Sequence, residues 1–225
     1  MSSVAARLRS RFVREISPFI YKLDEQRSNL VRIGSEYGGW WIPKELLSPD
    51  SICYLAGVGT DITFDLGIIE RYGCRVWGFD PTPKSIDWIK SQTIDEHFTL
   101  VPLGLAGDAG TLRFYAPQDP SHVSHSIKNL QHTDTYFEAR VATVRELMIE
   151  LGHDHIDLLK LDIEGAEHDT IRAMLQDGIL PTVLCVEFDQ PEPISWGRAT
   201  TQALQAAGYA LVKVDGFNLT FVREG

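Results

Sequence analysis

The sequence predicts an α/β fold built on a mostly parallel sheet that ends in an antiparallel hairpin. From residue 51 onward, short apolar segments alternate with amphipathic ones, and such alternation is typical of a parallel sheet covered on both faces. The last two predicted strands are joined by the short turn at Asp215 and Gly216, which is too tight for a parallel crossover, so one of them runs antiparallel. With 225 residues and 44% hydrophobic content, the chain can bury a substantial core.

The chain is predicted to have two parts, a helical extension over residues 1–48 and the sheet-forming domain over residues 49–225. An amphipathic helical pattern runs through residues 4–33, an irregular aromatic loop follows at residues 37–41, and residues 43–47 have the pattern of a short helix.

The start of the chain is basic. Residues 1–14 contain four arginines and no acid, a pattern of a transit peptide or of a helix that packs on its own acidic domain or on a second subunit. An apolar stripe at helical spacing is formed by Val4, Leu8, Phe12 and Ile16. Because a stripe outside the sheet needs a partner, we expect a homodimer whose contact includes residues 1–33.

The elements of the sheet-forming domain follow from apolar runs, capping residues and turn residues. The predicted strands are residues 51–56, 75–79, 98–103, 110–115, 156–161, 182–188, 209–214 and 218–222. The predicted helices are residues 61–72, 84–91, 164–175 and 197–207, with a further helix after Thr143. Thr143 and Glu146 have the spacing of a capping box. Residues 117–138 are polar and irregular, and a loop of this length is usually functional or mobile.

Composition excludes several classes of protein. The formal net charge of −10 argues against nonspecific nucleic-acid binding, which depends on a cationic surface. No apolar run approaches ~20 residues, so no membrane-spanning helix is expected. Three cysteines without a CxxC pair are typical of reduced, buried thiols in a cytoplasmic protein.

A ligand site is predicted at the carboxyl ends of the first two strands of this domain. Gly57 and Gly59 follow the first strand, and Asp80 ends the second, 21 residues after Gly59. This spacing suits a ribose diol held by the carboxylate. A full dinucleotide motif would need a third glycine where Ile62 stands, and Asp61 places negative charge where a pyrophosphate would sit. These features favour S-adenosylmethionine, whose ammonium suits Asp61; otherwise the glycines only turn the chain and Asp61 only caps a helix.

Carboxylates also crowd the junction after the strand at residues 156–161. Asp162 ends this strand, and Glu164 and Glu167 fall in the predicted first helical turn, where the helix dipole favours negative charge. We interpret Glu167 as a helix-capping residue, and Asp162 and Lys160 as functional.

Transfer of the methyl group of S-adenosylmethionine to an acceptor would need a group that takes up the acceptor's proton. The candidates are Asp162, Lys160, Glu187, His122 and His125. Lys160 would need a lowered pKa to act as a base, and otherwise forms a salt bridge with a neighbouring carboxylate. The two histidines either line the acceptor pocket or belong to a solvated loop.

A metal site is a further hypothesis. Asp162, Glu187 and Asp189 come from neighbouring predicted strands, and such an oxygen cluster suits Mg²⁺ or Ca²⁺. A divalent ion there would acidify an acceptor hydroxyl. The alternative is a set of hydrogen-bonding carboxylates in an acidic cleft.

Four segments resemble the FkbM family of S-adenosylmethionine-dependent methyltransferases over about residues 35–190. The segments are Tyr37-Gly38-Gly39-Trp40, Gly57-Val58-Gly59-Thr60-Asp61, Phe79-Asp80-Pro81-Thr82-Pro83 and, as the most specific, Lys160-Leu161-Asp162-Ile163-Glu164-Gly165-Ala166-Glu167. The family usually has Asn and Gly at the positions of Gly59 and Asp61, so this chain departs from the pattern there. The resemblance implies the class I methyltransferase fold, which is Rossmann-like, with a seven-stranded sheet whose last strand is antiparallel.

The resemblance also implies roles for individual residues. Gly57 and Gly59 would contact the methionine moiety, Asp80 the ribose, and Asp162 the methionine amine or the methyl-transfer site. The predicted cofactor-binding set is Gly57, Gly59, Asp61, Asp80, Pro81, Leu105 and Asp162. The predicted catalytic set is Asp162, Lys160 and His125.

Because family members typically methylate hydroxyls of sugars, glycolipids and other natural products, we expect O-methylation of a small-molecule or glycan acceptor. The alternatives are a nicotinamide-dependent oxidoreductase on a related sheet and a non-catalytic binding module. Titration with S-adenosylmethionine and NAD(H) would separate them.

Overall fold

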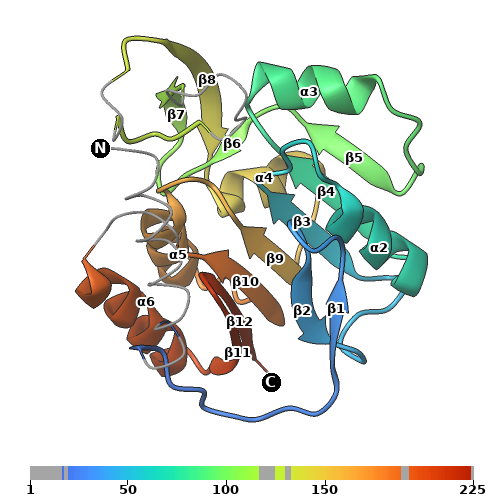
Figure 1. The fold of residues 1–225 in the computed structure, drawn as a ribbon, viewed down its shortest axis with the longest axis vertical. Helices are drawn as coiled ribbons and strands as arrows, with labels where there is room; N and C mark the ends of the chain where they lie inside the picture. Colours follow the sequence, from blue (N-terminus) through green and yellow to red (C-terminus); the bar gives the residue numbers. More distant parts are fainter. Residues whose placement is uncertain (1–16, 18–19, 117–124, 130–132, 189–192, 224–225) are drawn as a thin grey trace.

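The centre of the molecule is a seven-stranded sheet with strand order β11-β12-β10-β9-β3-β4-β5 (Figure 1). The computed structural model describes residues 17, 20–116, 125–129, 133–188 and 193–223. The strands of the sheet are β3 (Ile52–Ala56), β4 (Arg75–Phe79), β5 (Phe98–Val101), β9 (Leu158–Leu161), β10 (Val183–Glu187), β11 (Ala210–Asp215) and β12 (Asn218–Val222). β12 runs antiparallel to both of its neighbours, whereas β10, β9, β3, β4 and β5 are parallel. The predicted Rossmann-like sheet with a terminal antiparallel hairpin is confirmed.

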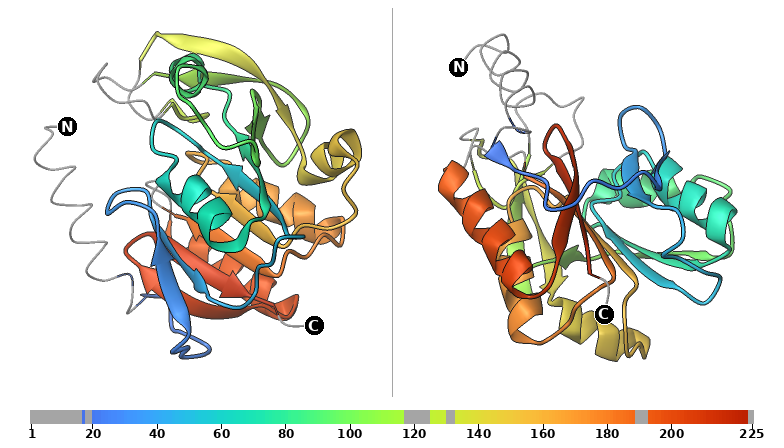
Figure 2. Two further views of the ribbon diagram at one scale, coloured as in Figure 1. Left: turned by 90° about the vertical axis from the view of Figure 1, so that its right-hand side faces the viewer. Right: turned by 90° about the horizontal axis from the view of Figure 1, so that it is seen from below.

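Helices cover both faces of this sheet (Figure 2). The helices are α2 (Thr63–Tyr72), α3 (Pro83–Lys90), α4 (Val144–Leu151), α5 (Glu167–Gln176) and α6 (Ile194–Ala206). The larger core cluster joins α4, α5 and α6 to the sheet, and α2 packs on the opposite face. The predicted capping box at the start of α4 is present, because Thr143 accepts a hydrogen bond from the Glu146 amide and Glu146 reaches back to the Thr143 amide.

A second, three-stranded sheet follows β5. It consists of β6 (Gly104–Leu105), β7 (Gly110–Tyr115) and β8 (Tyr136–Ala142). The sequence pattern predicts the β7 strand but not β8, and it predicts an irregular loop as far as residue 138. Phe114 and Phe137 stack across β7 and β8, with their ring centroids 5.2 Å apart, so the first part of β8 is ordered by its partner strand.

The N-terminal region differs from the prediction. Instead of a helix through residue 33, an aromatic loop and a second short helix, the chain forms an antiparallel hairpin of β1 (Leu30–Ile33) and β2 (Trp40–Pro43). Ile33, Trp40 and Ile42 are buried in the core cluster that contains α2. The predicted helices are therefore wrong for residues 21–33 and 43–47, because strand pairing and burial of the hairpin override the local helical pattern.

The apolar stripe on which the expected homodimer depends lies in residues 1–16, outside the described residues. Among the residues that the structure describes, no helix combines the length and apolar content needed to cross a bilayer.

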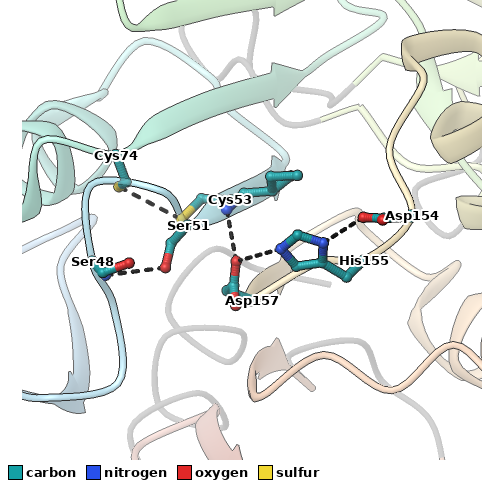
Figure 3. Close-up of polar contacts among 8 residues, drawn as sticks. Ser48, Ser51, Cys53, Cys74, Asp154, His155 and Asp157 are labelled. Carbon is teal, nitrogen blue, oxygen red and sulfur yellow. Dashed lines mark hydrogen bonds and ion pairs between the residues drawn. The ribbon is translucent and has the colours of Figure 1, made fainter.

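The amino ends of the parallel strands hold a compact polar cluster (Figure 3). The Ile52 amide donates to Asp157 Oδ2 at 2.8 Å, and His155 lies between Asp154 and Asp157. The buried thiols of Cys53 and Cys74 lie 3.7 Å apart and are not joined in a disulfide. Each labelled residue has a partner within the cluster, Ser48 through its backbone amide, which donates to Ser51 Oγ.

Candidate functional site

A pocket opens at the carboxyl ends of β3, β4, β9 and β10. It lies at the opposite end of these strands from the polar cluster at their amino ends. The strand order changes direction between β3 and β9, and ligands of open α/β sheets bind at such switch points. All residues of the predicted cofactor-binding and catalytic sets line this pocket together with Glu187: Gly57, Gly59, Asp61, Asp80, Pro81, Leu105, His125, Lys160, Asp162 and Glu187.

The turn after β3 depends on its two glycines. Gly57 has a φ of +79°, and a Cβ atom there would stand 1.7 Å from the carbonyl oxygen of Asp162, so only glycine allows the two loops to approach. Gly59 has a φ of +60°, and nothing lies within 4 Å of the position a Cβ atom would take. The first glycine closes the loops against each other, and the second leaves open space beside the pocket.

Asp80 organises the end of β4. Its buried carboxylate accepts hydrogen bonds from the Gly59 amide at 2.7 Å and the Thr82 amide at 2.8 Å. A carboxylate has about four acceptor positions, so two remain after these contacts. The geometry fits the predicted ribose contact, because the carboxylate is held rigidly and still has acceptor capacity.

Lys160 carries a buried positive charge beneath the pocket. Its side chain is 9% exposed, and Nζ donates to the Gly57 carbonyl oxygen at 2.8 Å and lies 3.0 Å from Asp162 Oδ2. Burial alone would lower the pKa of Lys160, but Asp162, Asp65 and Glu187 outweigh it, so the pKa is raised. The lowered pKa that a basic Lys160 would need is therefore not found, and its salt bridge with a carboxylate is.

Asp162 is ionised at neutral pH in this setting. Burial raises the pKa of its carboxyl group, but the Lys160 ammonium and a hydrogen bond with Glu187 outweigh that effect and hold it below its ordinary value. A carboxylate with a lowered pKa is a weak base. Asp162 is therefore better suited to orienting bound groups and holding charge than to removing a hydroxyl proton.

Asp61 joins the N-terminal hairpin to α2. Its Oδ2 accepts from Ser35 Oγ at 2.5 Å, and its Oδ1 accepts from Thr63 Oγ1 at 2.6 Å and the Thr63 amide at 3.1 Å. Burial alone would raise the pKa of Asp61, but these hydrogen bonds outweigh it and lower the pKa. Asp61 lines the pocket, yet both of its oxygens already accept from the chain's own donors.

The loop between β9 and α5 is shaped by Glu167. The buried carboxylate of Glu167 accepts from the Ile163 amide at 2.9 Å and the Gly165 amide at 3.0 Å. Glu164 takes a φ of +56°, which is uncommon outside glycine, and its carbonyl oxygen accepts from Ser126 Oγ at 2.7 Å. Residues 164–166 therefore form a loop rather than the predicted first helical turn, and Glu167 holds that loop in addition to starting α5.

One pocket residue, Asp65, was missed in the sequence, whereas Trp40 belongs to the predicted aromatic loop and to the first segment that resembles the family. Trp40 of β2 lies over the Lys160 ammonium, with Nζ 6.0 Å from a ring centroid. Asp65 of α2 is 4% exposed, and its Oδ1 has no hydrogen-bond partner among the described residues. Burial raises the pKa of Asp65 to about 6. The signal for Asp65 was a carboxylate on the buried face of an amphipathic helix, next to Phe64 and Ile68.

The predicted metal site finds no support. Asp162 and Glu187 both line the pocket, but Asp189 lies outside the described residues. Within the described part of the chain, no group of three or more His, Cys, Asp or Glu side chains is placed to hold a metal ion. Lys160 supplies the positive charge beside Asp162, so the arrangement matches the alternative of hydrogen-bonding carboxylates in an acidic cleft.

The loop histidines have different outcomes. His125 lines the pocket and packs edge-on against Phe137, with ring centroids 5.1 Å apart. His122 lies outside the described residues.

The fold and the pocket together define a class I methyltransferase dependent on S-adenosylmethionine. A family model described as "Methyltransferase FkbM domain" matches residues 56–211, and the chain belongs to this family. A search of curated proteins finds no match.

Several solved structures are similar to this chain at low sequence identity. A precorrin-6y C5,15-methyltransferase from Geobacter metallireducens is 14% identical, with a TM-score of 0.47 over 81% of this chain and 84% of that one. A fibrillarin pre-rRNA processing protein from Methanococcus jannaschii is 8% identical, with a TM-score of 0.44 over 92% and 84%. Aeropyrum pernix fibrillarin bound to S-adenosyl-L-methionine is 12% identical, with a TM-score of 0.43 over 88% and 84%.

Proposed function

We propose that this methyltransferase transfers the methyl group of S-adenosylmethionine to a hydroxyl oxygen of a small molecule, sugar or glycan. The observation that carries the choice of cofactor is the charge of the pocket. Among the described residues that line it, one lysine, Lys160, stands against six acidic side chains: Asp61, Asp65, Asp80, Asp162, Glu164 and Glu187. Such a lining attracts a ligand with sulfonium and ammonium groups and repels the diphosphate of a nicotinamide dinucleotide, which disfavours the oxidoreductase alternative.

The choice of oxygen as the acceptor rests on the family and on the residues beyond the cofactor loops. When bound, S-adenosylmethionine supplies an electrophilic methyl group. The acceptor oxygen forms a bond to the methyl carbon as the carbon–sulfur bond breaks, and the hydroxyl proton passes to a base. His125 lines the same pocket as the ionised Asp162. We assign His125 as the base and Asp162 as the residue that orients the reacting groups.

Product release tests this proposal. The protein is incubated with S-adenosylmethionine and a panel of hydroxyl acceptors or matched amines, and S-adenosylhomocysteine formation is measured. Turnover with hydroxyl acceptors, lowered ~10²-fold or more in His125→Ala, is the expected result. Turnover only with amines would refute the O-directed reaction.

Titration separates the alternatives. S-adenosylmethionine is expected to bind and NAD(H) is not. The reverse result would favour an oxidoreductase, and binding of S-adenosylmethionine without turnover on any acceptor would favour a non-catalytic module.

Assembly and location also belong to the proposal. We infer a homodimer whose contact includes residues 1–33, and we expect full-length protein to scatter light as a dimer. A chain lacking residues 1–16, which carry the apolar stripe and leave the β1–β2 hairpin intact, should be a monomer. A full-length monomer at micromolar concentration would refute the dimer. We assign the protein to the cytoplasm because its three cysteines are free and buried.

A further inference from the structure

Helix α2 brings two carboxylates to the cofactor pocket with different surroundings. Asp61 stands just before the helix and Asp65 lies in its first turn, and both line the pocket. Asp61 accepts hydrogen bonds from Ser35 and Thr63 on both of its oxygens. Asp65 is more deeply buried, and its Oδ1 accepts no hydrogen bond from any described residue. Among the described residues, no donor comparable to those at Asp61 reaches this oxygen of Asp65.

A buried carboxylate oxygen without a donor is unfavourable, so it is complementary to a donor that arrives with a ligand. Asp65 Oδ1 is the only buried side-chain oxygen of this kind among the pocket's described residues. The positive charge nearest to it in the pocket, Lys160, already donates to the Gly57 carbonyl oxygen and pairs with Asp162. Asp65 Oδ1 therefore remains available to accept a hydrogen bond from a positively charged donor.

S-adenosylmethionine has several groups that could contact this oxygen, and they differ in charge and in their ability to donate a hydrogen bond. A sulfonium carries charge but has no N–H or O–H to donate. The ribose hydroxyls donate but are neutral, and Asp80 already stands where a ribose is expected. The α-ammonium of the methionine moiety is both charged and a donor of three hydrogen bonds, and charge-assisted hydrogen bonds of this type are the strong ones.

We propose that Asp65 binds the α-ammonium group of S-adenosylmethionine. The proposal deepens the proposed function and depends on its cofactor. It moves the ammonium contact expected at Asp61 one helical turn along the chain, because Asp61 is occupied in holding Ser35 and the hairpin loop. Asp65 is thus a binding residue contributed by α2, next to the glycine turn that the family motif identifies.

The test compares two ligands that differ only at the ammonium. S-adenosylhomocysteine and its desamino analogue, in which CH₂ replaces the CH–NH₃⁺ unit, are titrated by calorimetry into wild-type protein and Asp65→Asn. The matched control is Glu70→Gln, an exposed carboxylate on the same helix. We expect Asp65→Asn to bind S-adenosylhomocysteine ~10-fold more weakly or worse, and the desamino analogue within about twofold of wild type. Glu70→Gln should change neither affinity.

Each other outcome has its own meaning. Equal losses for both ligands in Asp65→Asn would show a structural role and overturn the proposal. Unchanged affinity for both ligands would show that Asp65 does not contact the ammonium. If wild-type protein binds neither ligand, the cofactor assignment itself is wrong, and the ammonium proposal falls with it. Thermal unfolding of each variant verifies that the protein measured is folded.

Discussion

The two edges of the central sheet both carry buried or half-buried carboxylates, but they use them differently. At the amino edge, Asp157 accepts from the Ile52 amide and contacts His155, so the chain supplies its partners (Figure 3). At the carboxyl edge, Lys160 is shared among several carboxylates, and Asp65 Oδ1 has no partner among the described residues. The contrast separates carboxylates that stabilise the fold from one that is left for a ligand.

The difference follows from the direction of parallel strands. At the amino edge the amide of Ile52, the first residue of β3, donates to Asp157, whereas the loops at the carboxyl edge enclose a pocket that Asp65 and Asp162 line. Substitutions of Asp65 and Asp162 should therefore differ from substitution of Asp157 in their effects on stability and activity.

The largest effect is expected at Asp162. Asp162→Asn keeps the shape of the side chain but removes the charge beside Lys160, so we expect turnover to fall by ~10²-fold or more. The rate of S-adenosylhomocysteine release measures it, with circular dichroism as the check that the variant is folded. Turnover close to that of the wild type would show that Asp162 has no part in the reaction.

Asp65→Asn should stabilise the ligand-free protein at neutral pH. Burial raises the pKa of Asp65 from 3.8 to about 6, so the folded state binds the proton more tightly than the unfolded state. The wild type therefore loses stability as pH rises from about 4 to about 6, and above this range the variant should be more stable by up to roughly 3 kcal/mol.

Urea unfolding at pH 4.5 and pH 7.5 measures this effect. The free energy of unfolding of Asp65→Asn should exceed that of the wild type more at the higher pH. A variant that is less stable than the wild type at pH 7.5 would show that Asp65 has a structural partner.

Asp157→Ala at the amino edge should lower stability and leave turnover unchanged. The substitution leaves the Ile52 amide without its acceptor, which costs about 1–3 kcal/mol of unfolding free energy. Turnover at a temperature where the variant is folded should match the wild type, because Asp157 lies at the other end of the sheet. A large loss of turnover in the folded variant would contradict the claim that Asp157 serves only the stability of the fold.

Glu167→Gln should have the smallest effect of these four. The amide oxygen of Gln can still accept from the Ile163 amide, but the charge that strengthens this contact is lost, which should cost about 1 kcal/mol. The same unfolding measurements give the value. No change in stability would mean that the loop before α5 keeps its shape without this carboxylate.

Local patterns in the sequence are enough to predict the order of strands and helices in the sheet-forming domain. Apolar runs, the capping box at Thr143 and the tight turn at Asp215 are local signals. Each of them predicts its helix, strand or turn without information from the rest of the chain. The spacing of Gly57, Gly59 and Asp80 and the segment from Lys160 to Glu167 likewise predict a pocket at this position, because parallel strands bring their carboxyl ends to one edge.

The hydrogen-bond partners and pKa shifts of the charged groups in that pocket depend on the tertiary structure. The hairpin of residues 30–43 forms because its buried side chains pack on α2, a contact with no local signature, and its loop supplies the serine that occupies Asp61. The raised pKa of Lys160 depends on three carboxylates from different elements. The unpartnered oxygen of Asp65 can be recognised only when every neighbouring donor has been placed, because hydrogen bonding and burial are properties of the packed chain and not of any single segment.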